Sequence, residues 1–315
     1  MTAFYILISV ILLLLLAVLS VSLWIYFIAF YNKKDRDVSR EVLRGPDYDE
    51  FHDEMVDIID RALKIPFEEV RIRSYDGLSL YGRVYFQKEG APFHIQFNGY
   101  KGNGIRDFSG GLQLALASGG NVLLVDQRSH GRSDGHTICF GVKERFDVKS
   151  WTEYVIDRFG PDTIVFIEGV SMGAATVLMA SDTGLPGSVR GIVADCPYSS
   201  PFGIIYEVGK KTVRSARLMK PFIFVSALIF GHFNIFKSSA ENAVKNTEIP
   251  VLLIHGTGDH FVPYHMSEAI YAANPEMITF VSVEGAPHGL SCLKDHKKYE
   301  NAVNSFWNSC AGVQR

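Results

Sequence analysis

Three side chains in this 315-residue chain have the chemistry of a nucleophile, a base and an acid. Ser171 is the centre of a Gly-x-Ser-x-Gly pattern over residues 169–173, and Asp259 and His288 each lie in a loop that follows a short apolar run. A serine hydroxyl is a poor nucleophile unless a base removes its proton, and an imidazole serves as that base only when a carboxylate fixes its tautomer. The sequence therefore predicts Ser171 as nucleophile, His288 as general base and Asp259 as orienting acid.

The glycines that flank the serine have a mechanical explanation. The pattern follows a strand-like run and precedes a helix-like run, so Ser171 is expected at a sharp turn that projects its hydroxyl above a sheet. Side chains at Gly169 and Gly173 would collide with the strand or helix beside them. The bare pattern also arises by chance, so the strand-to-helix context is what makes it informative.

Each of these three residues also has an ordinary structural explanation. Ser171 could cap a helix, Asp259 could fix a turn, and His288 could be a surface or core histidine. Asp195, which follows the preceding apolar run, is the rival acid, and His260 is the rival base. The joint occurrence of all three residues in loops after strands, in the order Ser, Asp, His, favours the catalytic interpretation.

An oxyanion hole requires two backbone N–H groups that point at the developing charge. The first is expected from Met172, the residue after the nucleophile. The second is expected from Tyr100, in the glycine-rich loop Asn98–Gly104 that follows an apolar run.

The elements that must position these residues alternate between strand-like and helix-like segments. Residues 69–86 alternate with period two around Asp76-Gly77, which predicts a hairpin. Short runs that are apolar on both faces then follow at 94–99, 121–128, 163–171, 190–196, 250–256 and 278–285. Such runs indicate a doubly wound, mostly parallel α/β sheet with an antiparallel edge, whose chemistry lies at the carboxyl ends of the strands.

The first thirty residues predict a transmembrane helix. Phe4 to Phe30 contains no charge, and about 20 apolar residues suffice to cross a bilayer. The alternative is a cleaved secretory signal, but the run is too long and lacks a basic start and a small-x-small cleavage site. The bilayer is thus an expected partner through residues 4–30.

The charges after this run predict its orientation. Basic residues outnumber acidic ones there: Lys33, Lys34, Arg36 and Arg40 against Asp35 and Asp37. The positive-inside rule then places a single-pass protein in the cell membrane with its catalytic domain in the cytoplasm. The expected division is an anchor over 1–31, a tether over 32–66 and a catalytic domain over 67–315, with a cap at about 200–245.

Composition excludes other classes of function. A net charge of −3 offers no basic surplus for nucleic acid. The four cysteines are scattered without a CxxC pair, which predicts neither a metal site nor a redox site. No dinucleotide fingerprint or P-loop is present in the sequence, so no cofactor is expected.

Five motifs carry a resemblance to a known family: GVSMG at 169–173, NGYKGNG at 98–104, DQRSHGRSDG at 126–135, HGTGDHFVP at 255–263 and GAPHG at 285–289. With these motifs, residues 67–312 resemble the α/β-hydrolase superfamily, and within it the single-pass membrane-anchored bacterial serine hydrolases of the esterase and prolyl-oligopeptidase-like branch. The family loop usually begins His-Gly, whereas this loop begins Asn98-Gly99. That change is expected to alter the hydrogen bonds around the oxyanion hole and to leave the hole itself.

Two further segments have less specific interpretations. Asp126, Arg128, His130 and Arg132 are expected to form a structural ion and hydrogen-bond network under the site. The cap runs from basic residues to the apolar stretch 221–236, and it either packs on the core or meets lipid. Its basic residues are Lys210, Lys211, Arg214, Arg217 and Lys220.

The leading hypothesis for function is hydrolysis of an acyl ester or thioester through an acyl-enzyme. The substrate is expected to be a small acyl compound, with lipid-like molecules included. A peptidase or acyltransferase with the same triad is the enzymatic alternative. A membrane-tethered binding protein on a hydrolase scaffold is the non-enzymatic alternative, because fold alone does not determine function.

Overall fold

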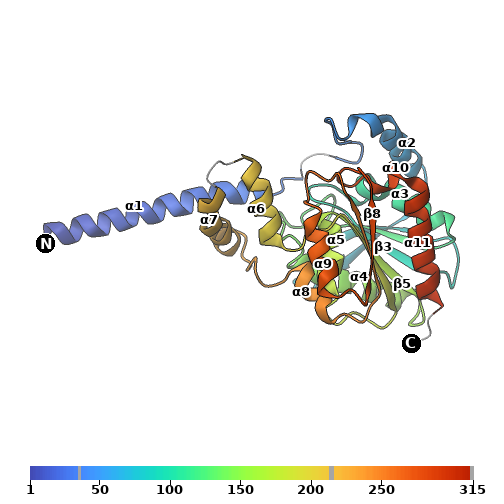
Figure 1. The fold of residues 1–315 in the computed structure, drawn as a ribbon. Coiled ribbons are helices and arrows are strands. Elements are labelled where there is room, and N and C mark those ends of the chain that lie inside the picture. Colours follow the sequence, from blue (N-terminus) through green and yellow to red (C-terminus); the bar gives the residue numbers. More distant parts are fainter. Residues whose placement is uncertain (35–36, 213–215, 313–315) are drawn as a thin grey trace.

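The computed structural model describes residues 1–34, 37–212 and 216–312 of the chain (Figure 1). Asp35 and Arg36, counted above among the flanking charges, and Arg214, counted among the basic residues of the cap, lie outside the described residues.

The described residues form an eight-stranded sheet in the order β1-β2-β4-β3-β5-β6-β7-β8. Its first three strands pair antiparallel, and the pairs from β4 and β3 to β8 are parallel. The strands are β1 Glu68–Arg73, β2 Ser79–Tyr85, β3 Phe93–Phe97, β4 Asn121–Asp126, β5 Val165–Val170, β6 Val189–Asp195, β7 Val251–Gly256 and β8 Ile278–Val283. The predicted fold class is confirmed, and each strand from β3 to β8 begins and ends within two residues of its expected boundaries.

Helices cover both faces of the sheet, as expected where strands are apolar on both sides. One buried cluster joins the sheet to α4, α5 and α9, and the other joins it to α2, α3 and α11. The helices of these layers are α2 His52–Ala62, α3 Gly104–Ala117, α4 Glu144–Phe159, α5 Met172–Ala180, α8 Ala240–Ala243, α9 His265–Ala273, α10 Ser291–Lys294 and α11 His296–Ala311. Short 3-10 turns, η2 Asp49–Phe51 and η5 Val244–Asn246, precede α2 and follow α8.

The N-terminal helix α1, Thr2–Ile25, projects from the rest of the molecule (Figure 1). Together with the π-helical turn η1, Tyr26–Phe30, it is the one helix within the described ranges that is long and apolar enough to cross a membrane. Its two ends differ. Residues 2–17 are exposed, whereas the Phe30 side chain is fully buried in the main core.

The segment between α1 and the sheet makes extensive contacts with the rest of the chain. Asn32 donates its backbone N–H to the carbonyl of His136 at 2.8 Å, and α2 packs against α3. Contacts with the sheet layers therefore begin well before residue 67, and the predicted boundaries of tether and domain stay predictions.

The cap lies between β6 and β7, at the junction between α1 and the sheet (Figure 1). Its described elements are α6 Pro201–Thr212, η3 Ala216–Met219, α7 Lys220–Val225 and η4 Ser226–Phe230. Both α7 and η4 contact α1.

Candidate active site

Ser171 occupies the tight turn between β5 and α5. Its backbone has φ 55° and ψ −116°, a conformation that side-chain-bearing residues rarely adopt. A Cβ on Gly169 would lie 2.2 Å from the carbonyl carbon of Gly173, and a Cβ on Gly173 would lie 1.9 Å from the carbonyl oxygen of Phe97. A side chain at either glycine would therefore overlap backbone atoms. The close packing holds the turn so that the serine side chain projects from the sheet edge.

The structure brings the three predicted side chains together. The Nε2 atom of His288 lies 2.9 Å from Oγ of Ser171, and its Nδ1 lies 2.6 Å from Oδ2 of Asp259. A carboxylate only accepts hydrogen bonds, so Nδ1 carries the proton and Nε2 is free to accept the serine proton. This is the tautomer that general-base catalysis needs.

Asp259 is held by donors on both oxygens. Oδ1 accepts the backbone N–H groups of Phe261 and Val262, each at 2.8 Å. Burial on its own would raise the pKa of Asp259, but hydrogen bonds from His255 and His288 lower it well below the usual value. The carboxylate is therefore ionised throughout the physiological range.

The sequence-based reasoning missed His255. This histidine, near the end of β7, is fully buried, and its Nε2 lies 3.1 Å from Oδ2 of Asp259. Its Nδ1 accepts the hydroxyl proton of Ser267 at 2.6 Å, which leaves the ring proton on Nε2. Two histidines thus donate to one carboxylate oxygen. The sequence signal that could have identified it is a histidine near the end of a strand, four residues before the predicted acid.

Neither rival residue takes part in this chain of hydrogen bonds. Asp195 is buried and accepts the hydroxyl of Ser291 at 3.2 Å, and burial raises its pKa to about 6. His260 is exposed, and its carbonyl accepts the ammonium of Lys211.

One group of donor atoms near the triad has the composition of a metal site. Cys196, Asp259 and His288 place their donor atoms within 4.8 Å of one another. Burial raises the pKa of the Cys196 thiol well above its usual value, whereas metal binding requires a thiolate. Nδ1 of His288 is also already bonded to Asp259. The residues fit a hydrogen-bonded triad better than a metal site.

The predicted oxyanion donors are the backbone N–H groups of Tyr100 and Met172. Among the described residues, none accepts the backbone N–H of Tyr100 or of Met172. The base of the loop is fixed by Asn98, whose side-chain oxygen accepts the N–H of Gln127 at 2.9 Å and whose carbonyl accepts the Gln127 amide at 2.6 Å. Asn98 thus ties β3 to the loop after β4.

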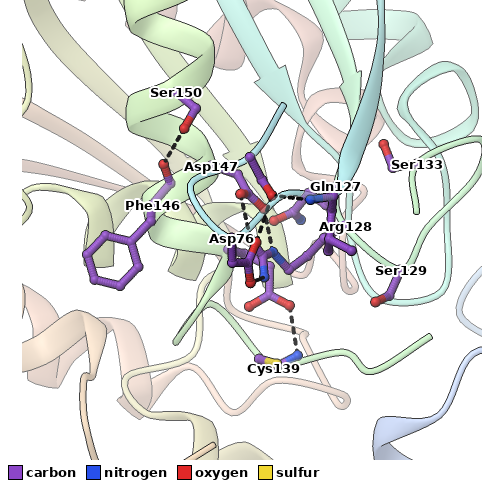
Figure 2. A network of polar contacts seen from close by, with 12 residues as sticks. Asp76, Gln127, Arg128, Ser129, Ser133, Cys139, Phe146, Asp147 and Ser150 are labelled. Carbon is purple, nitrogen blue, oxygen red and sulfur yellow. Dashed lines mark hydrogen bonds and ion pairs between the residues drawn. The ribbon is translucent and has the colours of Figure 1, made fainter. Parts of the chain in front are cut away.

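The network predicted below the site divides into separate parts. Arg128 lies between Asp76 and Asp147 and bonds both carboxylates at 2.6–3.0 Å (Figure 2). Asp126 accepts the backbone N–H groups of Gly104 and Arg132, each at 2.9 Å. These contacts fix loops at the carboxyl edge of the sheet.

His130 supports the oxyanion loop directly. Its Nδ1 donates to the carbonyl of Arg128 at 2.9 Å, and its Nε2 accepts the backbone N–H of Lys101 at 3.0 Å. Lys101 has φ 53°, so this bond holds a strained residue beside Tyr100. Complete burial lowers the pKa of His130 to about 4.

This burial predicts a pH-dependent loss of stability. Below pH 6.5 the unfolded chain binds a proton at His130 that the folded chain does not bind until about pH 4. The free energy of unfolding should therefore fall by about 3 kcal/mol from this residue as pH drops from 7 to 4. Denaturant titrations in detergent at both pH values should show a correspondingly smaller decrease for His130→Asn. Equal decreases in the two proteins would contradict the assignment.

The end of the N-terminal helix also contacts the loop that carries Tyr100. The hydroxyl of Tyr100 donates to the carbonyls of Ala29 at 2.9 Å and Ile28 at 3.2 Å, and the ammonium of Lys101 donates to Ile28 at 3.1 Å. Phe140 packs between the rings of Tyr100 and Phe30. The loop with the predicted oxyanion donor is thus held on one side by His130 and on the other by η1.

We expect Tyr100→Phe to lower kcat about tenfold with little change in KM or Tm. The variant keeps the ring and the backbone N–H but loses both hydrogen bonds to η1, and an oxyanion donor acts mainly in the transition state. The matched control is Tyr26→Phe, which removes the 2.8 Å contact with Thr137 from the same turn. Steady-state kinetics on the full chain measure the effect, and an unchanged kcat in Tyr100→Phe would overturn it.

Comparisons with known proteins agree with this architecture. A family model described as the alpha/beta hydrolase fold matches residues 97–212, which include Tyr100 and Ser171. The uncharacterized protein YqkD of Bacillus subtilis is 25% identical over 196 residues, 62% of this chain and 64% of its own length. The uncharacterized protein Rv2307c of Mycobacterium tuberculosis is 27% identical over 248 residues, 77% of this chain and 80% of its own.

Solved structures share the fold. The esterase Pf2001 of Pyrococcus furiosus superposes with a TM-score of 0.65 at 22% identity, covering 80% of this chain and 94% of the esterase. At this level of identity the likeness shows the fold alone. Together with the family match, it shows that the described sheet and its helices have the α/β-hydrolase fold.

Proposed function

We propose that this chain, which has the α/β-hydrolase fold, is a membrane-anchored serine hydrolase that cleaves an acyl ester or thioester through an acyl-enzyme intermediate. The observation that carries the proposal is the continuous set of hydrogen bonds from Ser171 through His288 to Asp259, with the two distances of 2.9 and 2.6 Å. Its support is geometric, because fold similarity alone does not determine function.

The first half of the proposed reaction forms the acyl-enzyme. Oγ of Ser171 attacks the substrate carbonyl carbon while Nε2 of His288 takes the hydroxyl proton. The carbonyl oxygen becomes an oxyanion, which accepts the backbone N–H groups of Tyr100 and Met172. Collapse of this intermediate breaks the bond to the leaving alcohol or thiol, and His288 returns the proton to it.

The second half releases the acid. Water attacks the acyl-enzyme carbonyl carbon as Nε2 of His288 takes its proton, and the second tetrahedral intermediate collapses with that proton returned to Oγ of Ser171. Asp259 remains ionised and stabilises the imidazolium in both halves, and His255 keeps the carboxylate oriented. The net reaction consumes one water and yields a carboxylic acid and an alcohol or thiol.

The anchor is proposed to be retained rather than cleaved. A signal peptidase cut near the end of the apolar run would remove Ile25 and Phe30, both buried in the main core, and the carbonyls that hold Tyr100. Phenylalanine lost from a core typically costs about 3–5 kcal/mol. The proposed location is the cell membrane with the catalytic domain in the cytoplasm, on the basis of the flanking basic residues.

The substrate preference tests this function. We expect p-nitrophenyl esters of medium acyl length to give a higher kcat/KM than the acetate or aminoacyl-anilides, because each buried methylene contributes about 0.8 kcal/mol until the pocket is filled. The assay should use the full chain in detergent, since removal of residues 1–31 would take out Phe30.

Alternative activities give different profiles in this assay. A clear preference for anilides would select a peptidase, and product formation that requires an added alcohol acceptor would select an acyltransferase. Turnover of none of these substrates, with no covalent labelling, would leave the binding-protein alternative.

A further inference from the structure

After its first residue, Lys220, the helix formed by α7 and η4 is apolar on all sides. From Pro221 to Phe230 its one polar residue is Ser226, which is itself buried. A helix of this composition normally lies inside a large core or in a membrane. Here the outer face is open, because Leu228 is 42% exposed and Ile229 is 48% exposed.

This helix packs against the second half of α1. The side chains of α1 and η1 that become covered from residue 18 onward recur at helical spacing and are Val18, Leu19, Ser22, Ile25, Tyr26 and Ala29. The rings of Tyr26 and Phe230 lie 6.2 Å apart, and those of Phe30 and Phe233 lie 5.6 Å apart. The cap and the end of α1 therefore form one packed unit.

The length of α1 places this unit at the membrane. The part of α1 that the cap leaves uncovered, residues 2–17, is only about 24 Å long, whereas the hydrocarbon core is about 30 Å thick. A span of about 20 residues that begins at Phe4 ends near Leu23, inside the covered stretch. A bilayer around α1 therefore reaches the depth at which α7 and η4 contact it.

The exposed side chains of α1 and η1 at that depth agree with this position. Trp24, Phe27 and Ile28 are each more than half exposed. Aromatic residues are typical of the boundary between hydrocarbon and headgroups. The apolar outer faces of α1 and of the cap are therefore neighbours at the same level of the molecule (Figure 1).

The charges on the cap fit anionic headgroups. Within the described part of the hairpin from α6 to η4, Glu207 is the one acidic residue, and the basic residues are Lys210, Lys211, Arg217 and Lys220. Basic residues beside an apolar helix are typical of segments that lie in the interface of membranes with anionic lipid.

We propose that α7 and η4 form an interfacial membrane element, with a bilayer that contains anionic phospholipid as its partner. Leu228 and Ile229 contact the acyl-chain layer, and the basic residues next to this helix, Arg217 and Lys220, lie among the phosphates. This interaction does not depend on catalysis.

The position of the cap has a consequence for the proposed hydrolase. Lys211 at the end of α6 donates to the carbonyl of His260, beside Asp259, and η1 holds the oxyanion loop through Tyr100. The cap and the turn that ends the N-terminal helix thus both contact loops of the catalytic site. If the proposed function holds, the site receives acyl esters that partition into the membrane interface.

Quenching of tryptophan fluorescence by brominated lipids tests the membrane contact. In the full chain with Trp24→Phe, the remaining tryptophans, Trp151 and Trp307, are 1% and 6% exposed and serve as a constant background. A new tryptophan is introduced by Leu228→Trp, with Ile229→Trp as a second variant if the first does not fold. Each protein is reconstituted in vesicles of phosphatidylcholine and phosphatidylglycerol with bromine on the acyl chains.

The matched control is Phe86→Trp in the same background. Phe86 is 52% exposed and follows β2 at the sheet edge opposite Ser171. We expect at least twofold stronger quenching of the cap tryptophan than of the control, and weaker quenching of the cap tryptophan in vesicles of phosphatidylcholine alone. Quenching equal to that of the control would overturn the proposal, whether the face lies in water or is covered by a second copy of the chain. Equal quenching of the cap tryptophan in both vesicles would overturn its anionic-lipid component.

Discussion

Replacement of Ser171 by alanine is expected to lower kcat by at least about a thousandfold, to the level of the uncatalysed reaction plus the residual effect of the oxyanion hole. The variant removes one oxygen atom and keeps the turn, because alanine adds no atom near Gly169 or Gly173. Tm should therefore stay close to that of the unmodified chain. Initial rates with a medium-length p-nitrophenyl ester, together with a thermal melt in detergent, measure both quantities.

The matched control for this variant is Ser181→Ala. Ser181 follows α5, the helix that begins after the nucleophile, and its hydroxyl donates only to carbonyls, those of Leu178 and Ala243. This change should leave kcat within about twofold, as expected for a half-buried residue away from the reacting atoms. A Ser171→Ala variant with near-normal turnover would rule out the assigned nucleophile.

Asp259→Asn is expected to lower kcat by about four orders of magnitude with the fold retained. The backbone N–H groups of Phe261 and Val262 require an acceptor at the Oδ1 position, so the amide oxygen must occupy it. The amide nitrogen then faces Nδ1 of His288 and donates to it. The ring proton moves to Nε2, which can no longer accept the hydroxyl proton of Ser171.

Asp195→Asn separates this role from general effects of buried charge. Asp195 is also buried near the site, but its carboxylate accepts a hydrogen bond from the hydroxyl of Ser291 and not from His288. We expect a change in kcat of less than about tenfold for this variant. The reverse pattern, with Asp195→Asn the more damaging change, would assign the acid to Asp195.

Much of the fold and the geometry of the candidate triad follow from local sequence signals. The strands are short apolar runs bounded by glycine-rich loops, and a parallel sheet places the ends of β5, β7 and β8 at one edge. That topology alone brings Ser171, Asp259 and His288 into the same region. The catalytic roles of these residues and of Tyr100 and Met172 remain predictions that the experiments above test.

Other features could not be inferred because they depend on contacts between distant segments. His255 reads as one more residue of an apolar strand, and its bond to Asp259 becomes visible only when the following turn folds back. Phe30 reads as the last residue of a membrane span, yet it packs on Phe140 more than one hundred positions later. An apolar pattern shows that a side chain avoids water, but it does not show whether lipid or protein covers that side chain.

The measurement that tests the central claim most directly is the site of covalent modification by a fluorophosphonate. The full chain in detergent is treated with the probe, digested and sequenced by mass spectrometry. An activated serine nucleophile attacks the phosphorus and displaces fluoride, so a single adduct on Ser171 is the predicted result. The Asp259→Asn change should slow the labelling. No adduct on the folded protein, or an adduct on a serine other than Ser171, would contradict the proposed serine hydrolase.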